Sequence, residues 1–124
     1  MQKIQSFTIN HNTLVEGIYI SRIDGDVTTY DLRFRKPNSG DYLTDIAMHS
    51  VEHMLATYLR NSNNEETLLE LKLALQKTIE HQGKIFGNTK VECGNYKCLS
   101  LASAKKECKR YLDILNSKEH TFKY

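Results

Sequence analysis

The sequence predicts an α+β fold in which an antiparallel β-sheet carries helices packed on one face, in a single domain. Two observations lead to this prediction. The first third of the chain is strand-like, whereas three segments with helical spacing of apolar residues follow it. Strands and helices that come in separate blocks are typical of α+β proteins. The length of 124 residues fits one domain.

A β-hairpin is predicted in the first third. Residues 4–9 form a β-prone run, and Gly17–Ile23 is rich in branched and aromatic residues. The turn signal Asp24–Asp26 follows, and then side chains alternate along Val27–Phe34. Two β-prone runs around a short Asp-Gly turn indicate an antiparallel hairpin.

Three helices are predicted next. The first runs from about Thr44 to Arg60, with Thr44 or Asp45 as its cap, because its apolar residues recur at helical spacing. The second runs from Glu65 to about Gln82 and stops at Gly83.

The third helix is predicted from Ser100 to about Leu115. We expect the polar tail that follows, residues 116–124, to be frayed.

Composition excludes several classes of function. Seventeen Lys and Arg against fifteen Asp and Glu leave a net charge of +2, which is smaller than the positive charge typical of a nucleic-acid-binding domain. No apolar stretch approaches the roughly 20 residues of a membrane span, and the first ten residues lack the core of a signal peptide. Three cysteines are too few for a disulfide framework and fit thiols in a reducing compartment, free or metal-bound. The expected location is the cytoplasm.

The segment His49–His53 carries the most informative residues. Positions i and i+4 share a helix face, so the imidazoles of His49 and His53 can point at one ion. Glu52 lies beside them without having to bind the ion, which suits a general acid or base. The alternative is a pair of ordinary helix histidines with a solvated glutamate.

A catalytic metal site needs a third protein ligand and one open position. Cys93 stands out because it lies in a loop where Gly94 lets the backbone come close. Cys108 is expected in the core, and His81 and His120 are expected to be solvated. The full set of candidates is Cys93, Cys98, Cys108, His11, His81 and His120.

Five segments spread over most of the chain carry recognisable motifs: Ser6–His11, Tyr30–Phe34 with Pro37-Asn38, His49–His53, Leu59–Asn61 and Glu92–Tyr96. In this order they resemble the motifs of the S-ribosylhomocysteine lyase (LuxS) family. The combination is specific, although a single His-x-x-Glu-His is not.

The resemblance implies a divalent metal, natively iron(II) and replaceable by zinc or cobalt, held by His49, His53 and Cys93. It implies that the metal activates ribose oxygens of S-ribosylhomocysteine as a Lewis acid. The carbonyl then moves along the sugar, and elimination releases homocysteine and dihydroxy-pentanedione, the autoinducer-2 precursor. Glu52 would be one acid/base. The associated roles are quorum sensing and the activated methyl cycle.

The resemblance also places three residues at the substrate site, namely Ser6, His11 and Arg33. Each also has an ordinary structural interpretation, with Arg33 as a surface salt-bridge residue and Ser6 and His11 as polar edge residues. Members of the family are homodimers whose active sites take residues from both chains, and the same is implied for this chain.

One departure concerns a second catalytic group. The family carries a cysteine between the metal helix and the next helix, whereas this chain has no cysteine before Cys93. We therefore interpret residues 1–124 as one LuxS-like metal-binding domain that lacks an internal segment between about 61 and 65. Either the chain is a shortened paralogue, or the sequence has lost a segment that the protein carries, or Cys98 or Cys108 replaces the thiol. The intact remaining motifs favour the second explanation.

Two rival functions share the motif. Inverted zinc peptidases also use His-x-x-Glu-His, but they are much larger domains with a glutamate as third ligand. The other rival is a metal-binding or dimerising module without turnover.

Overall fold

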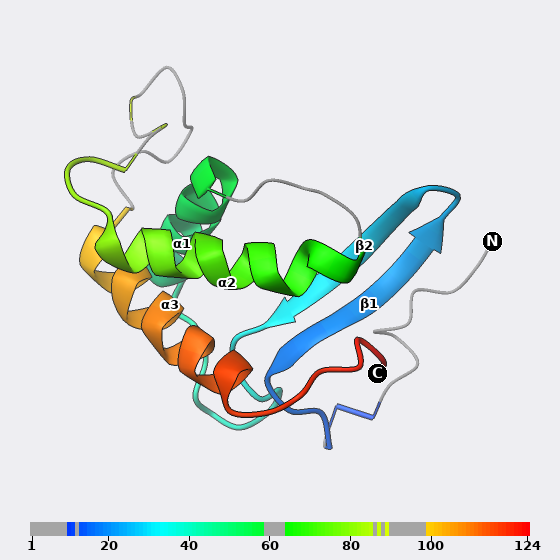
Figure 1. Ribbon diagram of the computed structural model, residues 1–124. Helices are drawn as coiled ribbons and strands as arrows, with labels where there is room; N and C mark the ends of the chain where they lie inside the picture. Colours follow the sequence, from blue (N-terminus) through cyan, green and yellow to red (C-terminus); the bar gives the residue numbers. More distant parts are fainter. Residues whose placement is uncertain (1–9, 12, 59–63, 86, 88, 90–98) are drawn as a thin grey trace. The chain divides into compact units, whose positions relative to one another are not determined.

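The computed structural model describes residues 10–11, 13–58, 64–85, 87, 89 and 99–124. Within these residues it contains a two-stranded antiparallel sheet and three helices, which confirms the α+β class (Figure 1). The β-prone run at residues 4–9 lies outside the described residues, and the placement of helices against the sheet stays a prediction. The chain divides into two compact units, residues 1–42 with 114–124 and residues 43–113.

The predicted hairpin consists of β1 (Gly17–Asp24) and β2 (Val27–Arg33), shown in blue and cyan in Figure 1. Asp24 pairs with Val27, so the turn has two central residues. Of these only Gly25 has a positive φ, 59°, which is typical of a type II′ hairpin turn. The register shifts between Ile20 and Arg22, which leaves Ser21 as a bulge residue.

The C-terminal tail is ordered against the hairpin, so the prediction of a frayed tail is wrong. The Ile20 N–H donates to the Phe122 carbonyl oxygen at 2.8 Å. The Lys118 ammonium donates to the Glu16 carbonyl oxygen at 2.7 Å. Tail and hairpin lie about a hundred residues apart in sequence, so the composition of the tail alone does not indicate such partners.

The second unit contains α1 (Asp45–Tyr58) and α2 (Asn64–Glu80), which pack against each other. Thr44 is the N-cap of α1, because its Oγ1 accepts from the Ala47 N–H at 3.2 Å. Gly83, with φ at 89°, follows α2 as predicted.

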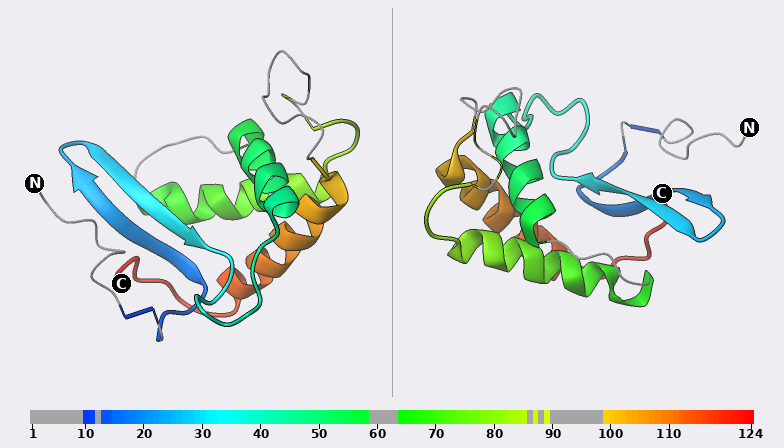
Figure 2. Two further views of the ribbon diagram at one scale, coloured as in Figure 1. Left: turned by 180° about the vertical axis from the view of Figure 1, so that it is seen from behind. Right: turned by 90° about the horizontal axis from the view of Figure 1, so that it is seen from above.

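The third helix, α3 (Leu101–Asn116), is capped by Ser100, whose Oγ accepts from the Ser103 N–H at 3.2 Å. Two further views show the course of α1 and α2 within their own unit and of the two hairpin strands within the other (Figure 2). None of the helices in the described part of the chain is both long and apolar enough to cross a bilayer. The buried apolar residues of the second unit's helices are Ala47, Val51, Met54, Leu55, Leu71, Ala74, Leu75, Ala104, Cys108, Tyr111 and Leu112.

Candidate metal pair and substrate residues

Two histidines on α1 face each other. The Nε2 atoms of His49 and His53 are 3.1 Å apart, and the rings meet edge to face with centroids 4.7 Å apart. Two imidazole nitrogens bound to one tetrahedral zinc ion at ordinary bond lengths lie about 3.3 Å apart. The donor atoms therefore already have the separation of a chelating pair. Without an ion, one ring donates a hydrogen bond to the other.

Glu52 shares a surface hollow with His53. The hollow has a volume of about 340 Å³ and is lined by Glu52, His53, Ala56, Thr57 and Gly87. The Glu52 side chain is exposed, so its carboxylate is accessible to a ligand in this hollow. A carboxylate beside an imidazole pair is placed for proton transfer.

Ser50 joins the start of α3 to α1 by a hydrogen bond, a role that was not predicted from the sequence. Its side chain is fully buried; Oγ donates to the Ile46 carbonyl oxygen at 2.7 Å and accepts from the Ser100 N–H at 2.6 Å. The available signal was a small polar residue in line with the apolar residues Ala47 and Met54.

The third metal ligand predicted from the sequence, Cys93, lies outside the described residues, as do Ser6 and Cys98. Among the described residues, no group of three His, Cys, Asp or Glu side chains is arranged to hold a metal ion. Cys108 lies in the core, as predicted.

The prediction of a solvated His81 is wrong, because the residue is 6% exposed. Its Nδ1 lies 2.6 Å from the Tyr58 hydroxyl, and its Nε2 lies 2.9 Å from the Lys84 carbonyl oxygen. These partners account for the burial of a polar ring at a helix end. His120 is half-buried, with Nε2 3.1 Å from the Leu115 carbonyl oxygen.

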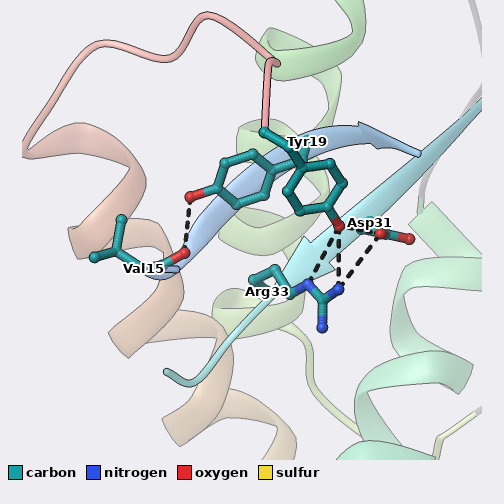
Figure 3. A network of polar contacts seen from close by, with 5 residues as sticks. Val15, Tyr19, Asp31 and Arg33 are labelled. Atoms are coloured by element: carbon teal, nitrogen blue, oxygen red, sulfur yellow. Dashed lines mark hydrogen bonds and ion pairs between the residues drawn. The ribbon is translucent and has the colours of Figure 1, made fainter. Parts of the chain in front are cut away.

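Arg33 belongs to a polar network on the hairpin (Figure 3). Its guanidinium donates to the Tyr124 hydroxyl, at 3.1 Å from one terminal nitrogen, and lies 3.6 Å from the Asp31 carboxylate. The Tyr124 hydroxyl in turn donates to Asp31. The Tyr124 ring stacks on Tyr19, with centroids 4.6 Å apart.

Burial raises the pKa of the Tyr124 phenol to about 12, and the hydrogen bond to Asp31 acts in the same direction, against the lowering effect of Arg33. Tyr124 therefore stays protonated and bridges Asp31 and Arg33. The last predicted substrate residue, His11, is half-buried in the same unit as Arg33.

A family model described as S-ribosylhomocysteinase (LuxS) matches residues 4–72. A protein of Finegoldia magna named S-ribosylhomocysteine lyase is 34% identical over 146 aligned positions, covering 94% of this chain and 94% of that protein. A protein of the same name from Borreliella burgdorferi is 35% identical over 156 positions, covering 100% and 99%. The chain belongs to the S-ribosylhomocysteinase (LuxS) family. A LuxS relative from Clostridium beijerinckii, with the same lyase name, is 32% identical over 157 positions, covering 100% and 99%.

The region that matches the LuxS model contains most of the residues predicted for the site. The alignment with the Clostridium beijerinckii LuxS protein has 157 positions, whereas this chain has 124 residues. That relative therefore carries residues without a counterpart here. The predicted site residues within the matched region are Ser6, His11, Arg33, His49, Glu52 and His53.

Proposed function

We propose that this chain is a metal-dependent lyase that cleaves S-ribosylhomocysteine to homocysteine and dihydroxy-pentanedione, the autoinducer-2 precursor. The observation that carries the proposal is the His49–His53 pair, with Nε2 atoms 3.1 Å apart beside Glu52, in a LuxS chain. The substrate comes from the printed name of the relatives.

The proposed metal is a divalent ion, Fe²⁺ with Zn²⁺ or Co²⁺ as substitutes, held by His49, His53 and Cys93. When bound, such an ion supplies Lewis-acid activation of ribose oxygens. Two contacts support Cys93 as the third ligand. On both sides of it in the sequence the chain comes close to α1: a Cβ added to Gly87 would be 3.3 Å from His53 Nδ1, and the Ser100 N–H donates to the Ser50 Oγ.

Glu52 is the proposed acid/base. Moving a carbonyl along a sugar requires that a proton leave one carbon and that a proton be delivered to its neighbour. An accessible carboxylate in the hollow beside His53 can accept the first and return the second. Elimination of the homocysteine thiolate then needs one further carbon-bound proton to be removed.

Arg33, His11 and Ser6 are the proposed substrate-binding residues. Asp31 and Tyr124 hold the Arg33 guanidinium on the hairpin. Its planar set of donors suits a carboxylate or adjacent hydroxyls of a polar substrate.

A second candidate function is a metal-binding LuxS module with little turnover. Its support concerns the cysteine base that the family resemblance implies. No cysteine precedes Cys93 in the chain, and Cys108 is fully buried with its pKa raised to about 12. A thiol in that state supplies no thiolate near neutral pH.

The test is release of homocysteine thiol from S-ribosylhomocysteine, followed with a thiol reagent, by metal-loaded protein of verified 14.4 kDa mass. Glu52→Gln is expected to lower kcat by about 10²–10⁴-fold and keep the metal, because it removes proton transfer only. Cys93→Ala is expected to lose the metal.

The outcomes separate the candidates. Thiol release that depends on Glu52 supports the lyase. Metal binding without thiol release supports the module. Metal fully retained in Cys93→Ala contradicts the ligand assignment, and a wild-type protein that binds no divalent ion overturns both functions.

A further inference from the structure

Gly87 lies close enough to the His53 ring that a side chain at this position would meet it. A Cβ added to residue 87 would be 3.3 Å from Nδ1 and 3.4 Å from Cε1 of His53. Non-bonded heavy atoms prefer separations of about 3.5–4.0 Å. A side chain at residue 87 would therefore press on the edge of the His53 ring that includes Nδ1.

Conformation alone does not account for this glycine. Gly87 has a φ of 75°, in the left-handed region that favours glycine. Gly25, Gly40 and Gly83 also lie in that region, yet an added Cβ at each would meet nothing within 4 Å. Among these four, only Gly87 combines the backbone conformation with a close approach to a side chain, and that side chain belongs to the imidazole pair.

Residue 87 lies beside His53, one of the two proposed histidine ligands of the metal. A ligating histidine must keep the orientation of its ring, and substitutions that disturb the groups around a ligand typically weaken metal binding 10–100-fold. The Nε2 of His53 lies 3.1 Å from the Nε2 of His49, while a Cβ at residue 87 would lie beside the Nδ1–Cε1 edge of the ring.

We propose that Gly87 is a positioning residue for the metal site. The absence of a side chain at residue 87 leaves room for the His53 ring in the orientation in which Nε2 faces His49. The effect on metal affinity rests on the proposed function, whereas the space that the ring needs beside residue 87 does not.

The experiment compares Gly87→Ala with Gly83→Ala. Both substitutions place a Cβ on a left-handed backbone, so they share that strain, but only residue 87 meets His53. Co²⁺ is titrated into each protein and followed by its visible absorption. We expect Gly87→Ala to lower Co²⁺ affinity by about tenfold or more relative to Gly83→Ala.

A metal-free arm uses thermal unfolding and a double-mutant cycle. Gly87→Ala should lower Tm more than Gly83→Ala does, and His53→Ala should remove the extra loss, because the added methyl then has no ring to meet. Equal Co²⁺ affinities of the two glycine variants, or no coupling between positions 87 and 53, would overturn the proposal. If wild-type protein binds no Co²⁺, the metal function fails, and the cycle alone decides whether the His53 ring needs the space that Gly87 leaves.

Discussion

The Cys108 thiol is buried in α3 beside Thr78 of α2. Burial raises its pKa to about 12, and the nearby Glu107 carboxylate adds to the effect, while a hydrogen bond with Thr78 opposes it. Near neutral pH the group is a thiol, which is neither a base nor a nucleophile. Cys108 is therefore a core residue, and its state does not suit the role of a cysteine base.

The raised pKa predicts a pH-dependent contribution of Cys108 to stability. The thiol ionises at about 9 when unfolded and at about 12 when folded. Its stabilising effect is full below pH 9 and falls by about 1.4 kcal/mol per pH unit between 9 and 12. Urea unfolding from pH 7 to 10.5 should show the stability difference between wild type and Cys108→Ala shrinking above pH 9. Other titrating groups contribute equally to both proteins, so a constant difference contradicts the assignment.

At the scale of the elements, a hydrogen bond joins the C-terminal ends of α1 and α2. The Tyr58 hydroxyl lies 2.6 Å from Nδ1 of His81, and Nε2 of that ring lies 2.9 Å from the Lys84 carbonyl oxygen. A carbonyl oxygen only accepts, so Nε2 carries a proton and Nδ1 of the neutral ring accepts from Tyr58. In the sequence α2 begins shortly after α1 ends, so this bond joins the end of α1 to the opposite end of α2.

Tyr58→Phe is expected to lower the free energy of unfolding by about 1–2 kcal/mol, because it removes the hydroxyl that serves a buried ring. Chemical denaturation measures the change. Tyr42→Phe is the matched control: Tyr42 is 59% exposed, and the loss of its hydroxyl should change stability by less than about 0.5 kcal/mol. Equal effects of the two substitutions would show that the bond to His81 does not stabilise the helix pair.

Local sequence predicted the elements well because their signals are local. Helical spacing and the Thr44 cap set the start of α1, and Gly25 set the hairpin turn. The errors concern residues whose partners are distant. His81 is buried by Tyr58, 23 positions away, and the tail is ordered by strands that precede it by about a hundred residues. Neither partnership leaves a periodic pattern.

At the scale of the molecule, the residues predicted for the site belong to both units. Arg33 and His11 belong to the unit with the hairpin, and His49, Glu52 and His53 belong to the unit with the helices. Spacing on one helix predicted the imidazole pair, whereas Tyr124 as a partner of Arg33 had no sequence signal. We propose a homodimer in which each active site combines Arg33 of one chain with Glu52 of the other.

Mixed dimers test this arrangement. Arg33→Ala and Glu52→Gln are each expected to be inactive as homodimers, because every site then lacks one group. Co-refolding equal amounts should make half of the dimers hybrid, each with one intact site and one doubly altered site. Thiol release should therefore recover to about a quarter of the wild-type rate. Both variants should retain the metal, which verifies that neither is unfolded. If each site were built from a single chain, every site in the mixture would still lack one group, and no mixing ratio would restore activity.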